Sequence, residues 1–345
     1  MKKSTWGLLV GAVGLAVLCG CAEKKPTLHI YTWSDYVKPE LVQRFEAENG
    51  CRVVIDTFAS NEEMYAKLKA GATGYDLLFP SSYMVKIMHD QGMLRELDPA
   101  LLPNLKNVDP AYLAMAVDKD MAHSVPYTVT VTCLGVLGSK VADFKPSWAM
   151  LERADLKGRM TLLNDHRETI GAALKFLGYS LNTLDDAQLA AAKEVVLRWK
   201  KNVAKFENEQ YKTGLASGEF LLTHGYSGDL MLVQSENDDI QIAVPEEGSA
   251  LSFDDMAIPT AAKQVDLAHK FIDFVLDPQV AAELTEYIYF LCPNAASYEL
   301  LSEEIRSDPI LFPPPEVVAK LEMIGDLGDQ NVKYTKLWDE IKAGE

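Results

Sequence analysis

The chain has 345 residues, of which 48% are hydrophobic and 24% charged, so it is long enough for two domains and unlike a disordered protein. Its 50 acidic residues outnumber its 33 basic ones, which gives a formal net charge of −17. Because nucleic-acid binding relies on a basic face, this balance argues against a nucleic-acid partner. It suits a cationic ligand, although an acidic surface also simply favours solubility.

The N-terminal residues are typical of an export signal. Met1-Lys2-Lys3 supplies positive charge and is followed by an apolar run too short to span a bilayer comfortably. The run ends in Leu18-Cys19-Gly20-Cys21, which resembles the lipobox of bacterial lipoproteins. We therefore expect a signal peptide at 1–20, lipidation of Cys21 and a tether at 21–26. A plain signal peptide or an uncleaved membrane anchor is the alternative.

Predicted strands and helices alternate along the first half of the mature chain. The expected strands are 27–31, 52–58 and 75–80, and the expected helices are 39–49, 60–71 and 82–92. Pro39 and Gly50 mark the start and stop of the first helix, and the spacing of Ser60 and Glu63 is that of a capping box. This order predicts a mostly parallel sheet with helices on both faces.

A second alternating run follows. The expected strands are 129–137, 159–163, 220–224 and 240–244, and the expected helices are 168–177, 185–201, 266–287 with a break at Asp277-Pro278, and 315–342 with an interruption at 325–330. Two α/β lobes are therefore predicted. Ligands of such sheets bind beyond the carboxyl ends of the strands, and between the lobes where there are two.

The motifs of common enzyme classes are missing from the sequence. The six histidines form neither H-x-H nor H-E-x-x-H, and no phosphate-binding or dinucleotide-binding glycine motif occurs. Gly225-Tyr226-Ser227-Gly228 lacks the spacing of a nucleophile elbow. Cys51, Cys133 and Cys292 are odd in number and widely spaced, so we expect buried free thiols rather than disulfides or a zinc site. No cofactor and no metal are expected.

Carboxylates and aromatic rings recur where predicted strands end. The segments are Trp33-Ser34-Asp35-Tyr36, Ser81-Ser82-Tyr83, Asp165-His166-Arg167-Glu168, Tyr226-Ser227-Gly228-Asp229, and Ser252-Phe253-Asp254-Asp255 before a β-like stretch at 256–259. Each alone could be a loop with ordinary caps. Carboxylates pair with ammonium groups, while ring faces attract cations and cover methylene groups. Together these segments suit a linear alkyl amine.

From Leu28 to its C-terminus the chain resembles the bacterial polyamine-binding proteins of ABC importers, the spermidine/putrescine receptors. The residues that carry the resemblance are Tyr31-Thr32-Trp33-Ser34-Asp35-Tyr36-Val37, Tyr75-Asp76-Leu77-Leu78-Phe79-Pro80-Ser81-Ser82-Tyr83, Val125-Pro126-Tyr127, Asp165-His166-Arg167-Glu168, Asp254 with Ala257-Ile258-Pro259, and Pro293-Asn294. The resemblance implies a two-lobe periplasmic-binding-protein fold of type II. We expect one lobe from 27–132 plus 256–300 and the other from 133–255 plus 301–345.

The resemblance also implies a set of ligand-binding residues. These are Trp33, Ser34, Asp35, Tyr36, Ser81, Tyr83, Asp165, Arg167, Glu168, Tyr226, Asp229, Phe253, Asp254, Phe290 and Gln330. Aromatic residues would wall the ligand, and Ser34 and Asp35 would bind one amine. Glu168, oriented by Arg167, and Asp165 would face a second amine. Asp254 would pair with the central or a terminal ammonium. Asp229 stands where putrescine-preferring members carry an acidic residue.

The sequence departs from the family pattern at three aromatic positions. Tyr226 stands where many relatives have a tryptophan, Ser252 where they have a large aromatic residue, and Phe290 where they have a tyrosine. A smaller aromatic enclosure could change which ligand is preferred.

We therefore expect a monomeric, lipid-anchored receptor in the periplasm. It would bind putrescine or spermidine between its lobes, close around the ligand and deliver it to an ABC importer permease. Three alternatives stay open: a receptor for another cation, such as a basic amino acid or a thiamine-like compound; a polyamine sensor subunit; and an exported amine-processing enzyme, for which no catalytic constellation is visible.

Overall fold

The computed structural model describes residues 25–344. The expected signal peptide, the lipidation site Cys21 and most of the tether lie outside the described residues. Within 25–344, no helix is both long enough and apolar enough to cross a membrane.

Within the described residues the strands form one ten-stranded sheet of order β2-β1-β3-β9-β4-β7-β5-β6, with β10 beside β9 and β8 beside β4. The strands are β1 (Thr27–Thr32), β2 (Arg52–Thr57), β3 (Leu77–Leu78), β4 (Ser124–Leu137), β5 (Met160–Leu162), β6 (Lys205–Phe206), β7 (Leu222–Tyr226), β8 (Ile240–Ala243), β9 (Ala250–Ala257) and β10 (Glu322–Met323). Strand β1 pairs in parallel with β2 and β3, and β5 pairs in parallel with β6 and β7. The predicted parallel sheets are therefore confirmed at both ends.

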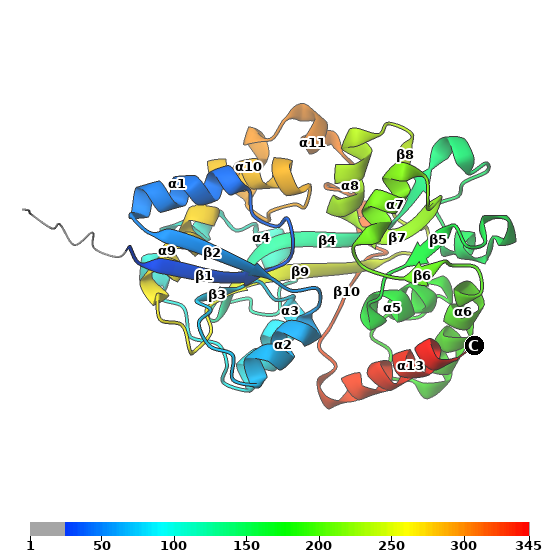
Figure 1. The fold of residues 1–345 in the computed structure, drawn as a ribbon, viewed down its shortest axis with the longest axis horizontal. Coiled ribbons are helices and arrows are strands. Elements are labelled where there is room, and N and C mark those ends of the chain that lie inside the picture. The colour runs from blue at the N-terminus through cyan, green and yellow to red at the C-terminus, as the bar shows by residue number, and fades with distance from the viewer. Residues whose placement is uncertain (1–24, 345) are drawn as a thin grey trace, which may run out of the picture.

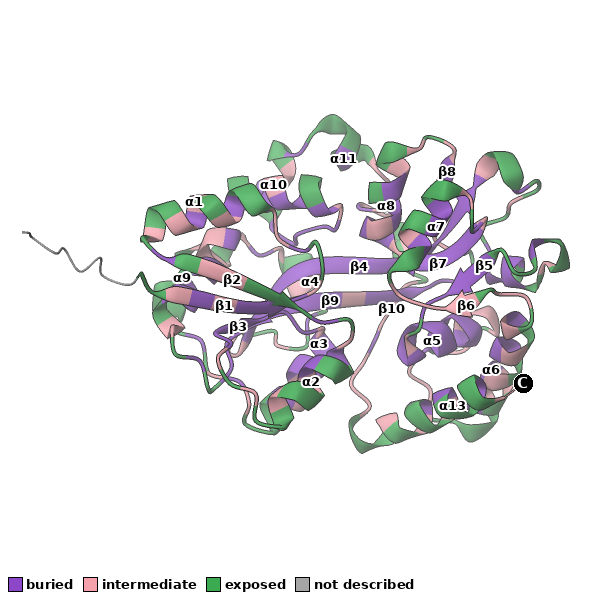
Figure 2. Ribbon diagram, viewed as in Figure 1, coloured by how far each residue is buried: buried purple, intermediate pink, exposed green. Residues whose placement is uncertain are grey.

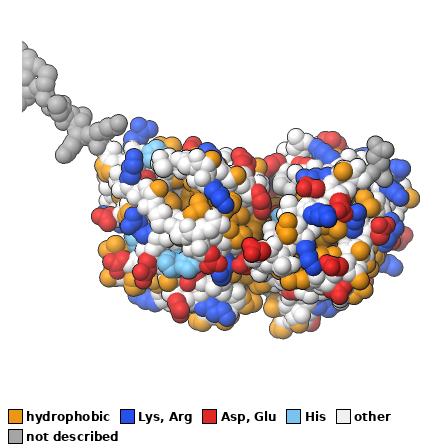
Figure 3. Space-filling model, turned by 90° about the horizontal axis from the view of Figure 1, so that it is seen from below, with side chains coloured by type: hydrophobic (Ala, Val, Ile, Leu, Met, Phe, Trp, Pro, Cys, Tyr) orange, Lys and Arg blue, Asp and Glu red, His pale blue; other side chains and the backbone are white. Residues whose placement is uncertain are grey.

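Two long strands connect these parallel parts. β4 and β9 pair antiparallel with each other, from Ser124 opposite Ala257 to Val131 opposite Leu251. β9 also pairs with β3, and β4 with β7, so both strands belong to both halves of the molecule. Figure 1 shows them side by side through the middle, and Figure 3 shows two rounded halves with a notch between them.

Helices cover both halves of the sheet (Figure 1). The α-helices are α1 (Pro39–Asn49), α2 (Asn61–Lys69), α3 (Ser82–Asp90), α4 (Pro110–Leu113), α5 (His166–Phe176), α6 (Asp186–Lys200), α7 (Gln210–Ser217), α8 (Ser227–Glu236), α9 (Val265–Val275), α10 (Pro278–Ile288), α11 (Glu303–Ser307), α12 (Pro315–Val318) and α13 (Asn331–Ala343). Helix α1 begins at Pro39 and ends before Gly50, which has a left-handed φ of 60° that glycine adopts freely. The predicted break at Asp277-Pro278 separates α9 from α10.

Each half has its own group of packed, buried side chains. Figure 2 colours the ribbon by burial and shows that β4 and much of β9 are buried. In one half, Phe45 of α1 and Phe271 of α9 pack edge to face. In the other, Trp148 and Trp199 are fully buried among residues of α5, α6 and α13. A third cluster lies along β4 and β9 and includes Phe253. Cys51, Cys133 and Cys292 are buried free thiols, as expected.

Two predicted elements differ markedly from the expectation. The strand 75–80 is reduced to Leu77–Leu78, because the Asp76 carboxylate accepts three backbone N–H groups and Pro80 has none to donate. The helix 315–342 is split into α12 and α13, and β10 lies between them beside β9. Glu322 in β10 accepts hydrogen bonds from the Leu181 backbone and the Asn182 side chain, and these tertiary contacts override the local helical pattern.

Candidate functional site

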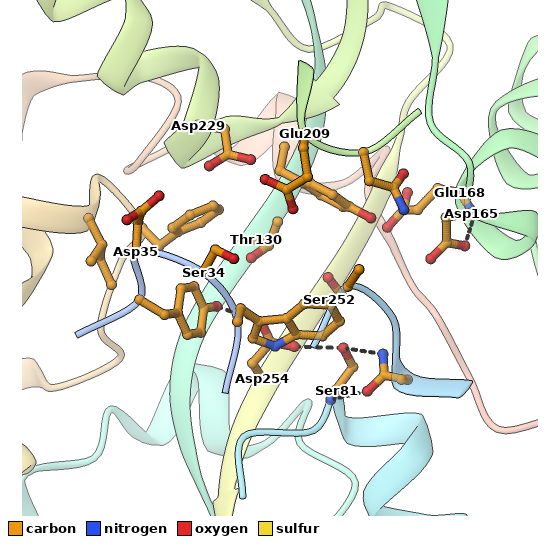
Figure 4. A pocket seen from close by; sticks show the side chains of 18 of the residues that line it. Ser34, Asp35, Ser81, Thr130, Asp165, Glu168, Glu209, Asp229, Ser252 and Asp254 are labelled. Atoms are coloured by element: carbon orange, nitrogen blue, oxygen red, sulfur yellow. Dashed lines mark hydrogen bonds between the residues drawn. The ribbon is translucent and has the colours of Figure 1, made fainter. Parts of the chain in front are cut away.

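A cavity of about 330 Å³ lies where the two halves meet (Figure 4). Its walls come from segments spread over the whole chain. The lining residues are Trp33, Ser34, Asp35, Tyr36, Ala59, Asn61, Ser81, Tyr83, Thr130, Asp165, Arg167, Glu168, Asn208, Glu209, Lys212, Tyr226, Asp229, Leu232, Ser252, Asp254, Tyr287, Ile288, Phe290 and Ile324.

The carboxyl ends of four strands supply much of this lining. Trp33 follows β1, Ser81 follows β3 closely, Asp165 follows β5, and Tyr226 ends β7. Parallel strands bring such ends to one edge of a sheet, which explains why residues distant in sequence meet here.

Most of the predicted site residues line this cavity. They are Trp33, Ser34, Asp35, Tyr36, Ser81, Tyr83, Asp165, Arg167, Glu168, Tyr226, Asp229, Asp254 and Phe290. Phe253 and Gln330 do not. Phe253 is fully buried in the cluster along β4 and β9, and Gln330 is exposed just before α13.

Phe253 was predicted to line the site, and that prediction is wrong because of where β9 begins. The sequence suggested a loop at 252–255 before a strand, whereas β9 already begins at Ala250. Side chains alternate across a strand, so Ser252 and Asp254 face the cavity while Phe253 points to the opposite side. Near the C-terminus it is Ile324, following β10, that reaches the cavity in place of Gln330.

Asp254 is held in place by two hydroxyl groups. The Tyr36 hydroxyl donates to its Oδ2 at 2.5 Å, and the Ser81 hydroxyl donates to its Oδ1 at 2.6 Å (Figure 4). Ser81 is itself fixed by Asn61, whose side chain forms two hydrogen bonds with it. Burial raises the pKa of Asp254 to about 6, although both hydroxyl groups oppose this rise.

Two further carboxyl groups, those of Asp165 and Glu168, lie at the start of helix α5. Asp165 is the N-cap and accepts the backbone N–H groups of Arg167 and Glu168 at 2.8 and 3.1 Å. Glu168 accepts a hydrogen bond from the Thr132 hydroxyl at 3.0 Å. Burial, together with the nearby Asp165, raises the pKa of Glu168 to about 8.

Arg167 was expected to orient Glu168, but among the described residues its guanidinium does not hydrogen-bond to the Glu168 carboxyl group. The Arg167 guanidinium donates instead to the Gly325 carbonyl at 2.9 Å and to Asn182 Oδ1 at 2.7 Å, and it lies 4.9 Å from the centre of the Tyr334 ring. Arg167 therefore connects α5 to the segment between β10 and α13. Burial lowers its pKa.

Asp229, in the first turn of α8, has partners within the protein. The Tyr211 hydroxyl donates to its Oδ2 at 2.5 Å, and Lys212 Nζ lies 3.6 Å from its Oδ1. Lys212 Nζ is also 3.3 Å from Glu209. Burial raises the pKa of Asp229, an effect that Lys212 and Tyr211 oppose.

Aromatic rings enclose the carboxyl groups. Trp33 packs edge to face against Phe58 with 4.4 Å between ring centres, and Tyr36 packs in the same way against Phe290 at 5.8 Å. Tyr226 lines the cavity where β7 ends. Such rings can cover methylene groups and attract cations.

Sequence reasoning missed part of the lining, chiefly Asn61, Thr130, Asn208, Glu209 and Lys212. Thr130 had a usable signal, because it alternates with Val129 and Val131 along a predicted strand. Lys212 had none, because α7 was not anticipated and a lysine near a helix start is commonly a surface residue.

The arrangement is chemically suited to binding an organic cation. Within residues 25–344, no group of three or more His, Cys, Asp or Glu side chains is placed to hold a metal ion. The cavity combines buried carboxyl groups, hydroxyl groups and aromatic faces, which together can hold an organic cation.

Known proteins resemble this chain over its full length. It is 37% identical over 348 residues to the spermidine/putrescine-binding periplasmic protein of Salmonella typhimurium, with 100% of both chains covered. It is also 37% identical to the putrescine/cadaverine-binding protein of Pseudomonas aeruginosa, with 99% of each covered. Both relatives are named as binding proteins.

A solved structure supports the same assignment at the level of the fold. The TpPotD lipoprotein of Treponema pallidum superimposes with a TM-score of 0.83 at 32% identity, covering 91% of this chain and 99% of that one. The expected two-lobe, type II periplasmic-binding-protein fold is thereby confirmed. Residues 40–313 match the family model for bacterial extracellular solute-binding proteins. The chain belongs to the family of bacterial extracellular solute-binding proteins.

Proposed function

We propose that this protein is the receptor of an ABC importer for polyamines and binds a linear diamine or triamine between its lobes. One observation carries the proposal: Asp254 and Glu168 are buried in a single cavity whose walls include aromatic rings. An alkyl amine has cationic ends and an apolar chain, and this lining offers a partner for each.

The electrostatics of the cavity favour a cationic ligand. Burial raises the pKa of Asp254 to about 6 and that of Glu168 to about 8, which means that each carboxylate lacks sufficient positive charge nearby. An ammonium group beside either one would restore its ionised form. The same ammonium could enter a buried site only if a carboxylate paired with it.

The relatives point to the same class of ligand. The Salmonella protein is named for spermidine and putrescine, and the Pseudomonas protein for putrescine and cadaverine. We propose that the ligand contacts the predicted residues that line the cavity.

We further propose that the two lobes, 27–132 plus 256–300 and 133–255 plus 301–345, close on the ligand. The cavity draws its walls from both sets of residues, and a ligand favours the closed state only through contacts with both. β4 and β9, which run through the middle of the molecule, would act as the hinge.

The proposal includes a monomeric protein attached to a membrane through lipid on Cys21 and facing the periplasm. The lipobox-like sequence Leu18-Cys19-Gly20-Cys21 supports it. Cell fractionation of the full chain and of Cys21→Ala tests it: the unaltered protein should be found with membranes and the variant should not.

Thermal unfolding of the mature protein tests the ligand class. Putrescine, cadaverine, spermidine, arginine, lysine and thiamine should be added separately, each over a range of concentrations. A ligand at 100 times its Kd adds about 2.7 kcal/mol to the free energy of unfolding, enough for a clear rise in Tm. A rise with at least one polyamine is expected. A rise only with the amino acids or thiamine would replace the proposed ligand, and no rise with any polyamine would refute the proposal.

A further inference from the structure

One end of the cavity already contains a cation that belongs to the protein. Lys212, in α7, places its Nζ 3.3 Å from Glu209 and 3.6 Å from Asp229. Its side chain is 19% exposed, so this ammonium is largely enclosed. Burial lowers the pKa of Lys212, but Asp229 and Glu209 outweigh that effect and leave the pKa raised, with a smaller contribution from Asp35. Lys212 is therefore charged at neutral pH.

Both carboxylate oxygens of Asp229 already have a partner within the protein. Its Oδ2 receives the Tyr211 hydroxyl at 2.5 Å, while its Oδ1 faces Lys212 Nζ. Tyr211 also accepts the backbone N–H of Tyr226 at 3.2 Å, which fixes the hydroxyl in this position. A ligand ammonium arriving at Asp229 would have to displace Lys212 or approach a like charge in a partly enclosed space.

Among the described lining residues the other cation is Arg167, whose guanidinium hydrogen-bonds to none of the cavity carboxylates. Asp254 is bonded to the neutral hydroxyl groups of Tyr36 and Ser81, and Glu168 is bonded to the neutral hydroxyl of Thr132. The Arg167 guanidinium is engaged by Gly325, Asn182 and the Tyr334 ring. Figure 4 shows Asp35 and Asp229 toward one side of the cavity and Asp165 and Glu168 toward the other.

We infer that Lys212 is a specificity-determining residue: its ammonium occupies the cation position at the Asp229 end, so that the site selects alkyl diamines over triamines. This inference rests on the proposed polyamine function. A diamine places one ammonium at Asp254 and the other at Asp165 and Glu168. A triamine must place a third ammonium. Of the remaining carboxylates of the lining, Asp35, Glu209 and Asp229, the last two are already paired with Lys212.

Replacing Lys212 tests this directly, with affinities for putrescine and spermidine measured by titration calorimetry. In Lys212→Met, which keeps an apolar stem and loses the charge, the ratio of the spermidine Kd to the putrescine Kd should fall by about tenfold or more, as for close charge pairs in enclosed sites. Lys212→Gln should lower the ratio in the same direction. Lys212→Arg keeps the charge and should keep the ratio within about twofold of the original.

Two further variants identify where the effect originates. Adding Asp229→Asn to Lys212→Met should cancel the gain for spermidine, because the carboxylate that received the third ammonium is gone. Lys193→Met removes a lysine from another ion pair of the same half, 2.8 Å from Glu340 and outside the cavity, and should leave the ratio unchanged. Circular dichroism and Tm show that each variant is folded before binding is compared.

Results that contradict the role of Lys212 can be distinguished from results that contradict the proposed function. An unchanged ratio in Lys212→Met and Lys212→Gln, with polyamines still bound, overturns the role of Lys212 and leaves the proposed function intact. An equal gain for both ligands also overturns it, since Lys212 would then be a general repulsive charge. If the unaltered protein binds neither polyamine, the proposed function fails and the inference fails with it.

Discussion

At the scale of single residues, Glu168 has the most unusual environment in the cavity. It is 3% exposed, it follows the N-cap of α5, and its single hydrogen-bond donor among the described side chains is Thr132. Because burial and Asp165 raise its pKa to about 8, the carboxyl group is mostly protonated at pH 7 in the unliganded protein. A bound ammonium needs the ionised form, so binding should expel this proton.

Glu168→Gln should therefore remove a pH dependence of binding as well as affinity. In the unaltered protein, diamine affinity should rise as the pH increases from 6 to 8, by at most about tenfold per pH unit. The variant should bind more weakly and with a much flatter profile, because its amide never ionises. Titration calorimetry in two buffers of different ionisation enthalpy counts the protons released.

Glu194→Gln serves as the control for this experiment. Glu194 is an exposed residue of α6 outside the cavity, and its substitution should leave both affinity and proton release unchanged. The same pH slope in Glu168→Gln as in the unaltered protein would assign the released proton to another group, with Asp254 the first alternative.

At the scale of elements, the packing of α8 against the chain after α10 shapes the cavity wall. Gly228 is in the first turn of α8, and a Cβ built there would lie 2.5 Å from the Phe290 ring. Phe290 lines the cavity and packs against Tyr36. The absence of a side chain at Gly228 thus allows the ring to pack directly against the helix.

Gly228→Ala should push Phe290 toward the cavity or α8 away from it. We expect a loss of about 1–3 kcal/mol in the free energy of unfolding, as for other overpacked cores, together with weaker polyamine binding. Denaturant titration and calorimetry measure the two effects. Gly171→Ala is a matched control in α5, since its nearest contact would be an ordinary 3.4 Å to Leu181, and it should be neutral or stabilising. Equal effects of the two substitutions would contradict this account of Gly228.

Elements with local signals could be predicted from the sequence. Helix α1 begins and ends at the residues that Pro39 and Gly50 indicated, and Ser60 caps α2 by accepting the backbone N–H of Glu63. The strand-end segments at Trp33 and Asp165 also reach the cavity, because parallel strands deliver their carboxyl ends to one edge.

Features set by tertiary contacts could not be predicted in this way. The face of β9 that Asp254 occupies depends on its register with β4, where it lies opposite Thr128, and the sequence alone does not determine that register. The pairing of β10 with β9 brings Ile324 rather than Gln330 to the cavity. The contact of Lys212 with Asp229 joins two helices and has no local signature.

At the scale of the whole molecule, the two long strands β4 and β9 bring buried acidic residues together at the centre of the fold. Asp254 and Asp255 are neighbours on β9, and Thr132 of β4 bonds to Glu168. Asp255 is 2% exposed and accepts a hydrogen bond from the Ser82 hydroxyl on the side of α3, and it is not part of the cavity lining. Burial, opposed by Ser82 and reinforced by Asp254, raises its pKa to about 7.

These raised pKa values determine how stability should depend on pH. An acid whose pKa is raised by folding binds its proton more tightly in the folded state than in the unfolded state. Its contribution to stability is therefore complete below its ordinary pKa and is lost as the pH rises through the folded value. For Asp255 that window runs from 3.8 to about 7, and for Glu168 from 4.5 to about 8.

The Tm of the unliganded protein should consequently fall between pH 5 and pH 8, and Asp255→Asn should make this fall smaller. The substituted amide can still accept the Ser82 hydroxyl but carries no charge at any pH, so its contribution is constant. Because Asp255 lies outside the cavity, the rise in Tm caused by a saturating diamine should be the same in the variant and the unaltered protein at each pH. Scanning calorimetry over this range, with and without diamine, measures both quantities.

A pH dependence of Tm that is identical in the two proteins would mean that Asp255 is ionised throughout. A change in the diamine effect would instead connect Asp255 to the binding site through its neighbour Asp254.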